Sequence, residues 1–504
     1  MIATLLAQTD WVAPTIDWHA LAPELILIVG INVVLGTDLL IAESKKWATA
    51  TITGFVLLAA FVPLVTLAVV GDDVRSLFDG RYVVDEFSLI LKALFLLTAY
   101  VVVLISQNEL EEGGYYQGEY YVLLLCSVLG MVMMASSRDL VSVFIALELL
   151  SIPAYMMAAW RKRDRKSNEA GVKYYLLGVF ASAVLLYGMS LLYGATGSTL
   201  LTEISRVLSE RELDGLVVVA VVFVVAGFAF KVSAVPFHTW APDTYQGAPL
   251  PVTAFLSVAS KSAGFVALVL VIFLAFPSLD GVYGPFVWVL SVLTMTVGNL
   301  LALRQTNIVR MLAYSSVSQG GFILMPLAYV NTGTAGDNAL KAVVIYLLVY
   351  AFTNLGAFAV VIAVSRKTHS GEISSFGGLI QYAPGLAVMM TLFLASLTGI
   401  PPLGGWIAKF NTFAVLLDAD TTSAYVLAVI GAANTAIAAA YYLRVMREMW
   451  MNDPPDGDQA PIVTPQPINV ALAITTGGMI LLGVLPGLVM RFADLEDLTG
   501  ALGR

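Results

Sequence analysis

Long apolar segments recur throughout this chain and constrain its fold more than any other feature. A helix needs about 20 predominantly apolar residues to cross the hydrocarbon core of a bilayer, and roughly fourteen segments meet that requirement. Hydrophobic residues make up 59% of the 504 residues and charged residues only 12%, whereas soluble domains are about 25% charged. The sequence therefore predicts an all-α polytopic membrane protein in a lipid bilayer, with a single membrane domain over residues 1–504.

The predicted spanning segments follow one another with short connections. They lie at 21–41, 48–70, 86–106, 119–136, 138–160, 169–194, 215–235, 250–276, 284–303, 307–329, 339–364, 386–416, 423–447 and 467–490. The longest hydrophilic stretches are 195–214 and 449–466, and the Pro- and Asp-rich composition of the second predicts an exposed loop.

Two proline-containing interruptions indicate an internal repeat. Pro236 follows the segment 215–235, and Pro401 and Pro402 interrupt the segment 386–416. We predict helices 1 to 3 in residues 1–118, a five-helix repeat in 119–276, a second five-helix repeat in 277–450, and a linker with the last helix in 451–504. Because five is an odd number, the second repeat would be inverted relative to the first. In transporters, inverted repeats with broken helices mark ion or substrate pathways near the bilayer midplane.

Lysine and arginine in the connecting loops predict the orientation of the chain. With the N-terminus outside, the inside loops hold thirteen of these residues and the outside loops hold eight. Cytoplasmic loops carry an excess of positive charge. The even number of spans then places both the N- and the C-terminus outside the cell membrane.

Composition excludes several classes of site. Cys126 is the single cysteine, which rules out a disulfide framework, structural zinc and cysteine-ligated iron–sulfur clusters within this chain. The three histidines lack metal-ligand spacing, and the sequence has no glycine-rich nucleotide-binding loop. The net charge of −9 argues against nucleic acid as a partner. We therefore expect no cofactor and no metal in this chain.

Six charged side chains stand out inside the predicted spans, where a charge at the bilayer centre costs about 2.5–3.5 kcal/mol on insertion scales. Removal from water disfavours the charged form of lysine, so a buried lysine can exchange a proton near neutral pH. Several such groups in one membrane protein are typical of a proton relay. The six are Lys92, Glu148, Lys173, Lys231, Lys261 and Lys409.

Glu148 and Lys231 are each followed five residues later by a proline, Pro153 and Pro236. Proline removes the hydrogen bond to the carbonyl four residues back. We therefore predict a helix break at each proline, with water at the freed carbonyls beside a titratable group. Two alternatives remain open. Glu148 can form a structural ion pair with a lysine, and Lys231 can be a helix-end lysine that reaches the interface.

Five further relay candidates have weaker or mixed signals. Lys261 lies about half-way along its segment, and Lys409 follows the second break. Lys173 and Lys92 lie within one or two turns of a segment end, so reaching the interface is the alternative to a place in the relay. His238 has an ordinary pKa near neutrality and is a further relay candidate; the alternative is an interfacial histidine at the break. We expect Asp243 to occupy the turn with no role in transfer.

Four stretches resemble the antiporter-like membrane subunits of respiratory complex I. They are LELLSIPAYMMAA (147–159), AGFAFKVSAVPFHTWAPDTYQGAPLPV (226–252), RMLAYSSVSQGGF (310–322) and LTGIPPLGGWIAKF (397–410). The likeness covers essentially the whole chain. The glutamate phrase followed by SIPAY, and a lysine at the second break, resemble one subunit type within this family. The absence of a long extra helix after the last span argues against the distal subunit, which carries a lateral helix.

The resemblance implies roles for individual residues. Glu148 and Lys231 would couple within a first half-channel, and Lys261 would connect the two halves. Lys409 would be the terminal lysine of a second half-channel, and Lys173 matches a further family lysine. The family's hydrophilic axis would run in the membrane plane through these residues.

The resemblance also implies a function for the whole chain. It would be a proton-translocating membrane subunit of NADH–quinone oxidoreductase, and so part of an enzyme, with no redox centre of its own. FMN, iron–sulfur clusters, NADH and quinone would belong to other subunits. Its partners would be small membrane subunits and a neighbouring antiporter-like subunit. The alternatives are a subunit of a multi-subunit cation/proton antiporter and a non-translocating membrane scaffold.

Overall fold

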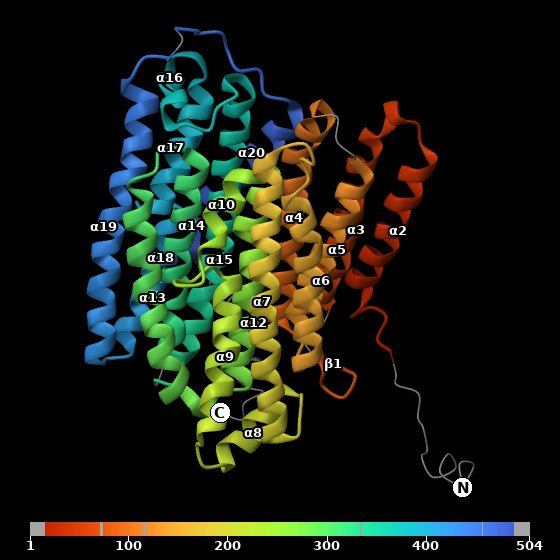
Figure 1. Ribbon diagram of the computed structural model, residues 1–504, viewed down its shortest axis with the longest axis vertical. Helices are drawn as coiled ribbons and strands as arrows, with labels where there is room; N and C mark the ends of the chain where they lie inside the picture. The colour runs from red at the N-terminus through yellow and green to blue at the C-terminus, as the bar shows by residue number, and fades with distance from the viewer. Residues whose placement is uncertain (1–15, 71–73, 114–116, 333–334, 456, 488–504) are drawn as a thin grey trace.

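The predicted apolar segments all correspond to helices or helix pairs in the computed structural model, which describes residues 16–70, 74–113, 117–332, 335–455 and 457–487. Within these residues, eleven helices are long and apolar enough to cross a membrane. Three shorter units account for the other predicted segments: two broken helices, and a helix followed by a 3-10 turn. The helices stand side by side as an upright bundle (Figure 1). The predicted all-α polytopic fold is confirmed.

The N-terminal part holds three long helices and a hairpin, and two groups of helices follow. The N-terminal elements are α2 (Ala22–Leu40), α3 (Trp47–Val70), β1 (Arg75–Leu77), β2 (Tyr82–Val84) and α4 (Glu86–Glu112). The first group is α5 (Gln117–Ser136), α6 (Leu140–Ala158), α7 (Arg165–Thr196), α8 (Leu201–Glu210), α9 (Gly215–Lys231), α10 (Trp240–Gly247), α11 (Leu250–Phe255) and α12 (Lys261–Leu274). The second is α13 (Asp280–Ala302), α14 (Ile308–Leu324), α15 (Ala335–Thr368), α16 (Leu379–Tyr382), α17 (Pro384–Thr398), α18 (Gly404–Asp418), α19 (Thr422–Met451) and α20 (Gln466–Val484).

The broken helices occupy corresponding places in the two groups. The pair α9–α10 follows the long helices α5, α6 and α7, and the pair α17–α18 follows α13, α14 and α15. In each group the helix before the break packs against the broken unit, α7 on α9 and α15 on α18. The predicted repeats in 119–276 and 277–450 and their inverted relation stay predictions.

The centre of the bundle is the unit α11–α12, which is buried along its whole length. A π-helical segment, Leu256–Ser260, joins the two helices. Such segments are frequent at functional sites because they shift the side chains that follow. The unit contacts α4, α5, α9 and α15. It therefore carries Lys261, at the start of α12, into the middle of the protein. By contrast, α2, α3 and α19 lie at the sides of the bundle (Figure 1) and expose many apolar side chains.

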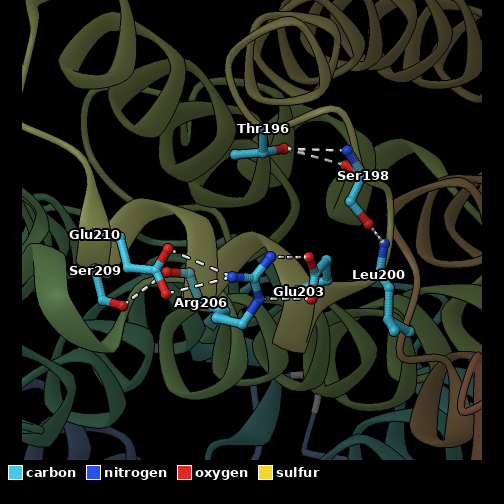
Figure 2. A network of polar contacts seen from close by, with 7 residues as sticks. All are labelled: Thr196, Ser198, Leu200, Glu203, Arg206, Ser209 and Glu210. Atoms are coloured by element: carbon cyan, nitrogen blue, oxygen red, sulfur yellow. Dashed lines mark hydrogen bonds and ion pairs between the residues drawn. The ribbon is translucent and has the colours of Figure 1, made fainter.

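The hydrophilic stretch 195–214 contains the amphipathic helix α8, at the end of the bundle that also holds the β1–β2 hairpin (Figure 1). Leu201, Ile204 and Leu208 recur at helical spacing and are buried against the bundle. On the outer face, Arg206 forms ion pairs with Glu203 at 2.5 Å and Glu210 at 3.3 Å (Figure 2). Exposed ion pairs of this kind contribute little to stability, so the buried apolar face holds α8 in place.

The structure corrects the predicted break at Pro153, confirms the one at Pro236, which lies between α9 and α10, and leaves one prediction open. Pro153 lies inside α6, which continues to Ala158, so the break predicted at this proline is wrong. The first real break begins directly after Lys231, before Pro236 is reached. The predicted position of both termini outside the membrane concerns residues 1–15 and 488–504, which lie outside the described residues. The predicted exposed loop between α19 and α20 is confirmed over its described residues.

Candidate functional site

At the first break, the C-terminal end of α9 is capped by backbone hydrogen bonds. Ser233 adopts the left-handed conformation with φ of 59°, and its N–H donates to the Phe230 carbonyl at 3.0 Å. The Ala234 N–H donates to the Ala229 carbonyl at 2.8 Å. These two bonds form a Schellman motif, which usually has glycine at the left-handed position. The chain therefore leaves the helix at Lys231, and residues 232–239 connect it to α10.

The helix before the second break, α17, ends in the same motif. Gly399 has φ of 95°. The Gly399 N–H donates to the Ser396 carbonyl at 2.9 Å, and the Ile400 N–H donates to the Ala395 carbonyl at 3.0 Å. Glycine meets no steric penalty at positive φ. Pro401 and Pro402 follow, and α18 begins at Gly404. The break predicted around these prolines is confirmed.

Each break places a lysine at the C-terminal end of its first half-helix. Lys231 is the last residue of α9. Lys409 belongs to α18, but its Nζ reaches back to the Thr398 carbonyl at the end of α17, at 3.0 Å. The C-terminal end of a helix carries partial negative charge, which favours a cation. The two lysines stand in opposite sequence order relative to their breaks, and of the two ammonium groups Lys409 Nζ is the one that donates to a carbonyl at the end of the first half-helix.

Lys231 is 3% exposed and is held by neutral groups. Its Nζ donates to Ser151 Oγ of α6 at 2.8 Å and to Tyr174 OH of α7 at 3.4 Å. Gly264 of α12 allows the central helix to approach, since a Cβ there would lie 2.9 Å from Lys231 Cγ. The alternative of a helix-end lysine that reaches the interface is therefore wrong for Lys231.

Glu148 is half-buried and does not pair directly with Lys231. Its Oε1 accepts a hydrogen bond from Ser182 Oγ of α7 at 2.5 Å. Among the described residues, no ion pair links Glu148 to a lysine. Ser151 lies three positions after Glu148 on the same helix, so the two side chains share a face. Lys231 therefore contacts the Ser151 hydroxyl of α6 rather than the Glu148 carboxylate, and the alternative of a structural Glu148–lysine pair has no support within the described part of the chain.

Lys261 is 2% exposed and lies just after the π-helical segment. Its Nζ donates to the Ser316 carbonyl at 2.8 Å and to Ser316 Oγ at 2.5 Å. Ser316 belongs to α14, so Lys261 links the central unit of the first group to the second group. The connecting role that the family resemblance implies for Lys261 stays a prediction.

Polar side chains continue from Ser316 toward the second break. Ser315 Oγ and Tyr442 OH are hydrogen-bonded at 2.5 Å, and Gln319 Nε2 donates to Tyr442 OH at 3.3 Å. Gln319 Nε2 also donates to the Leu397 carbonyl at 3.0 Å, and Tyr346 OH donates to Gln319 Oε1 at 2.5 Å. These partners come from four helices, α14, α15, α17 and α19. These hydrogen bonds join Ser315, Gln319, Tyr346 and Tyr442 into one buried network.

Lys409 closes this polar path at its far end. A small cavity of about 10 Å³ is lined by Gln319, Tyr346, Ser396 and Lys409, among others, which is close to the lower limit of about 10–15 Å³ for one water molecule. Lys409 is 4% exposed, and its Nζ lies 4.5 Å from the centre of the Phe322 ring. The side chain is therefore as secluded from solvent as Lys231 and Lys261.

Lys173 and His238 are not part of this buried path. Lys173 is 41% exposed and forms ion pairs with Glu169 at 2.6 Å and Asp243 at 2.7 Å. The prediction of Lys173 as a buried charge is therefore wrong. His238 lies in the connection between α9 and α10, half-buried, with its ring 6.5 Å from that of Tyr314. Asp243, expected in the turn with no role in transfer, lies instead in α10 and forms ion pairs with Lys173 and Arg310.

Lys92 is fully buried, but it has a carboxylate partner. Its Nζ forms an ion pair with Glu24 Oε1 of α2 at 2.8 Å and donates to Tyr82 OH at 3.1 Å. Tyr82 OH also hydrogen-bonds to Glu24. The Glu24 carboxylate therefore balances the charge of Lys92, and the side chain does not extend to the membrane interface. Glu24 lies inside the predicted span 21–41 and was missed because only the more central charges stood out.

The neutral groups around the buried lysines were not predicted from the sequence. Ser151, Tyr174 and Ser316 accept hydrogen bonds from Lys231 and Lys261, and Gln319 and Tyr346 belong to the neighbouring network. All five lie in apolar segments where single hydroxyls and amides are common. The run SSVSQ in α14 is the one local signal that could have indicated them. As for metals, the described residues contain no group of three or more His, Cys, Asp or Glu side chains that could hold an ion.

The geometry defines a polytopic membrane protein with a buried polar path between two broken helices. Residues 137–437 match the family described as "NADH:quinone oxidoreductase/Mrp antiporter, TM". The chain is 38% identical to NADH-quinone oxidoreductase subunit N of Trichlorobacter lovleyi, over 95% of this chain and 97% of that protein. A chain of respiratory complex I from Thermus thermophilus superimposes with a TM-score of 0.77 at 31% identity, covering 94% of this chain and 99% of that one.

A more distant structural relative shows the fold alone. A chain of the Mrp complex from Dietzia sp. superimposes with a TM-score of 0.83 at 21% identity, over 97% of this chain and all of that one (100%). The chain belongs to the NADH:quinone oxidoreductase/Mrp antiporter family and, within it, to the subunit N branch of NADH-quinone oxidoreductase. The resemblance identified from the sequence motifs is confirmed.

Proposed function

We propose that this chain translocates protons as a membrane subunit of NADH–quinone oxidoreductase, without a redox centre of its own. One observation carries the proposal. Lys231, Lys261 and Lys409 are each at most 4% exposed, and among the described residues none of them pairs with a carboxylate. A buried charge without a counter-ion is costly, so these lysines can change protonation state when hydration or a nearby charge changes.

The buried contacts support an order of transfer. Electron transfer in other subunits changes the charge or position of Glu148, which shares a face of α6 with the Ser151 hydroxyl bound to Lys231. The proton leaves Lys231 for Lys261 and continues through the polar network of α14 to Lys409. Hydroxyl and amide groups suit such a path because they both donate and accept hydrogen bonds.

The proposal assigns the redox chemistry and the partners to the rest of the complex. FMN, iron–sulfur clusters, NADH and quinone belong to other subunits, which agrees with the single cysteine of this chain. The neighbours are small membrane subunits and another antiporter-like subunit. The location is the plasma membrane, with both termini outside.

Copurification tests the assignment to the redox complex. The tagged chain, extracted in mild detergent, is expected to bring down flavin- and iron–sulfur-containing subunits together with NADH dehydrogenase activity. The measurement is subunit identification by mass spectrometry with a mock-tagged membrane as control. Copurification with small antiporter subunits and no redox subunit would support the cation/proton antiporter instead.

Glu148→Gln separates a translocating subunit from a scaffold. The change keeps the shape and a hydrogen-bond acceptor for Ser182 but removes the charge. We expect proton pumping per assembled complex to fall at least about tenfold, a loss typical of a missing proton-transfer group, with assembly retained. Glu203→Gln on the exposed α8 is the matched control. A scaffold predicts the opposite result, in which assembly falls and pumping per complex is unchanged.

A further inference from the structure

Asp243 of α10 holds two helices at once. Its Oδ1 accepts a hydrogen bond from Arg310 Nη1 of α14 at 2.7 Å, and its Oδ2 accepts one from Lys173 Nζ of α7 at 2.7 Å. Arg310 also donates to Gln246 Oε1 of α10 at 3.1 Å. Glu169 pairs with the same Lys173 ammonium at 2.6 Å and helps to fix it. The two carboxylate oxygens thus tie α10 to a helix of each group.

The C-terminal end of α10 packs too closely on α7 to shift freely. A Cβ at Gly247 would lie 2.5 Å from the Lys166 carbonyl oxygen and 2.7 Å from Ala170 Cβ. Glycine is therefore required for this close approach. With the ion pairs of Asp243, this contact fixes where α10 stands after the break.

The N-terminal end of α10 connects this attachment to Lys231. Trp240 Nε1 donates to the Phe230 carbonyl, one residue before Lys231, at 3.1 Å. The Trp240 ring stacks on Tyr174, with ring centres 4.4 Å apart and planes 12° apart. Tyr174 OH is one of the two hydroxyls that accept from Lys231 Nζ. A shift of α10 would therefore move the hydroxyl that holds the lysine.

We propose that Asp243 is a positioning residue, which holds α10 across the break and thereby keeps Tyr174 in place against Lys231. We call Asp243 and its two cationic partners the clamp, and we call the partners, Lys173 and Arg310, its arms. In this proposal Lys173 acts in the clamp and not as a proton-transfer residue. Individually, partly exposed ion pairs are weak. The effect of this cluster lies in geometry, because it joins three helices next to a helix break. The inference rests on the proposed function, since it assigns Lys231 a transferred proton.

The test compares variants in the whole complex, in native membrane vesicles. The quantities are kcat and KM for NADH and quinone, and the proton-pumping rate, all normalised to complex content by NADH oxidation with an artificial acceptor. Asp243→Asn is expected to lower kcat and pumping at least about twofold, within the range of mutations that modulate coupling, with both KM values unchanged. Asp243→Glu, which keeps the charge, is expected to restore most of the rate.

The arms and the controls make the result specific. Lys173→Met and Arg310→Met each leave one arm, so each is expected to have a smaller effect than the double variant, which should match Asp243→Asn. Asp214→Asn removes the same group from an exposed ion pair with Arg211 at the far end of α9, and is expected to retain the wild-type rate. If Asp243→Asn does not assemble, the two single-arm variants decide: lowered kcat in both supports the clamp, and wild-type kcat in both overturns it.

Lys231→Met, measured in parallel, separates this inference from the function on which it rests. A loss of pumping in Lys231→Met with wild-type rates in Asp243→Asn overturns the clamp and leaves the proposed function standing. Wild-type pumping in Lys231→Met overturns the proposed function itself.

Discussion

Replacing Lys231 with methionine in the assembled complex is expected to lower proton pumping and coupled quinone reduction at least about tenfold, as the loss of a proton-transfer group does. Methionine fills the same buried space next to Gly264 but carries no proton to the Ser151 and Tyr174 hydroxyls. The measurement is pumping in inverted membrane vesicles, normalised to complex content. Lys45→Met, at an exposed loop position, is the matched control and should retain the wild-type rate.

Lys231→Arg tests whether the positive charge alone, or a proton that can be released, is required at this position. Arginine keeps the positive charge, but its guanidinium does not release a proton in proteins. A relay therefore predicts that Lys231→Arg is nearly as inactive as Lys231→Met. An arginine variant with wild-type pumping would show that the charge at this position has a structural role, because a fixed charge would then be sufficient.

Removing Glu24 is expected to have the largest effect on stability. Glu24→Leu leaves the fully buried Lys92 without its carboxylate, and breaking a buried ion pair from one side costs about 3–5 kcal/mol. We expect a lower thermal midpoint of the purified complex and less of it in the membrane. Both are measured directly, by unfolding curves and by complex content.

The double variant Glu24→Leu with Lys92→Met is expected to recover most of this loss, since replacing both partners by apolar residues is often neutral or stabilising. Pumping per complex should stay close to wild type in the double variant. A stable double variant that does not pump would place Lys92 in the relay and contradict its structural assignment. The comparison separates a lysine held by a carboxylate from the three held by neutral groups.

Much of the fold could be predicted because membrane insertion depends on local composition. A segment of about 20 apolar residues spans a bilayer whatever its neighbours are, so the positions of the helices follow from the sequence directly. The break at Pro401 and Pro402 could be predicted for a similar reason, since glycine and proline act on their own backbone. Pro153 shows the limit of this reasoning, because one missing hydrogen bond did not end α6.

The candidate site, like the fold, could be predicted from the sequence only in part. That Lys231, Lys261 and Lys409 are buried follows from their depth in apolar segments, and the structure agrees. Lys173 and Lys231 each lie four positions from an end of their predicted segments, but Lys173 is partly exposed beside Asp243. A count of residues from a segment end could not separate these cases, because the position of each helix along the bundle is set by packing.

The sequence by itself determined where the apolar segments lie and that Lys231, Lys261 and Lys409 lie within them, since both depend on a short stretch of chain. Only the tertiary structure decided what each charge meets. Lys231 faces Tyr174, 57 positions away, and Lys261 faces Ser316, 55 positions away. Lys92 faces Glu24, whereas Glu148 faces a serine. Hydrogen-bond and ion-pair partners depend on the packing of helices that are distant in sequence, and that packing distinguishes a balanced structural charge from a lysine that can transfer a proton.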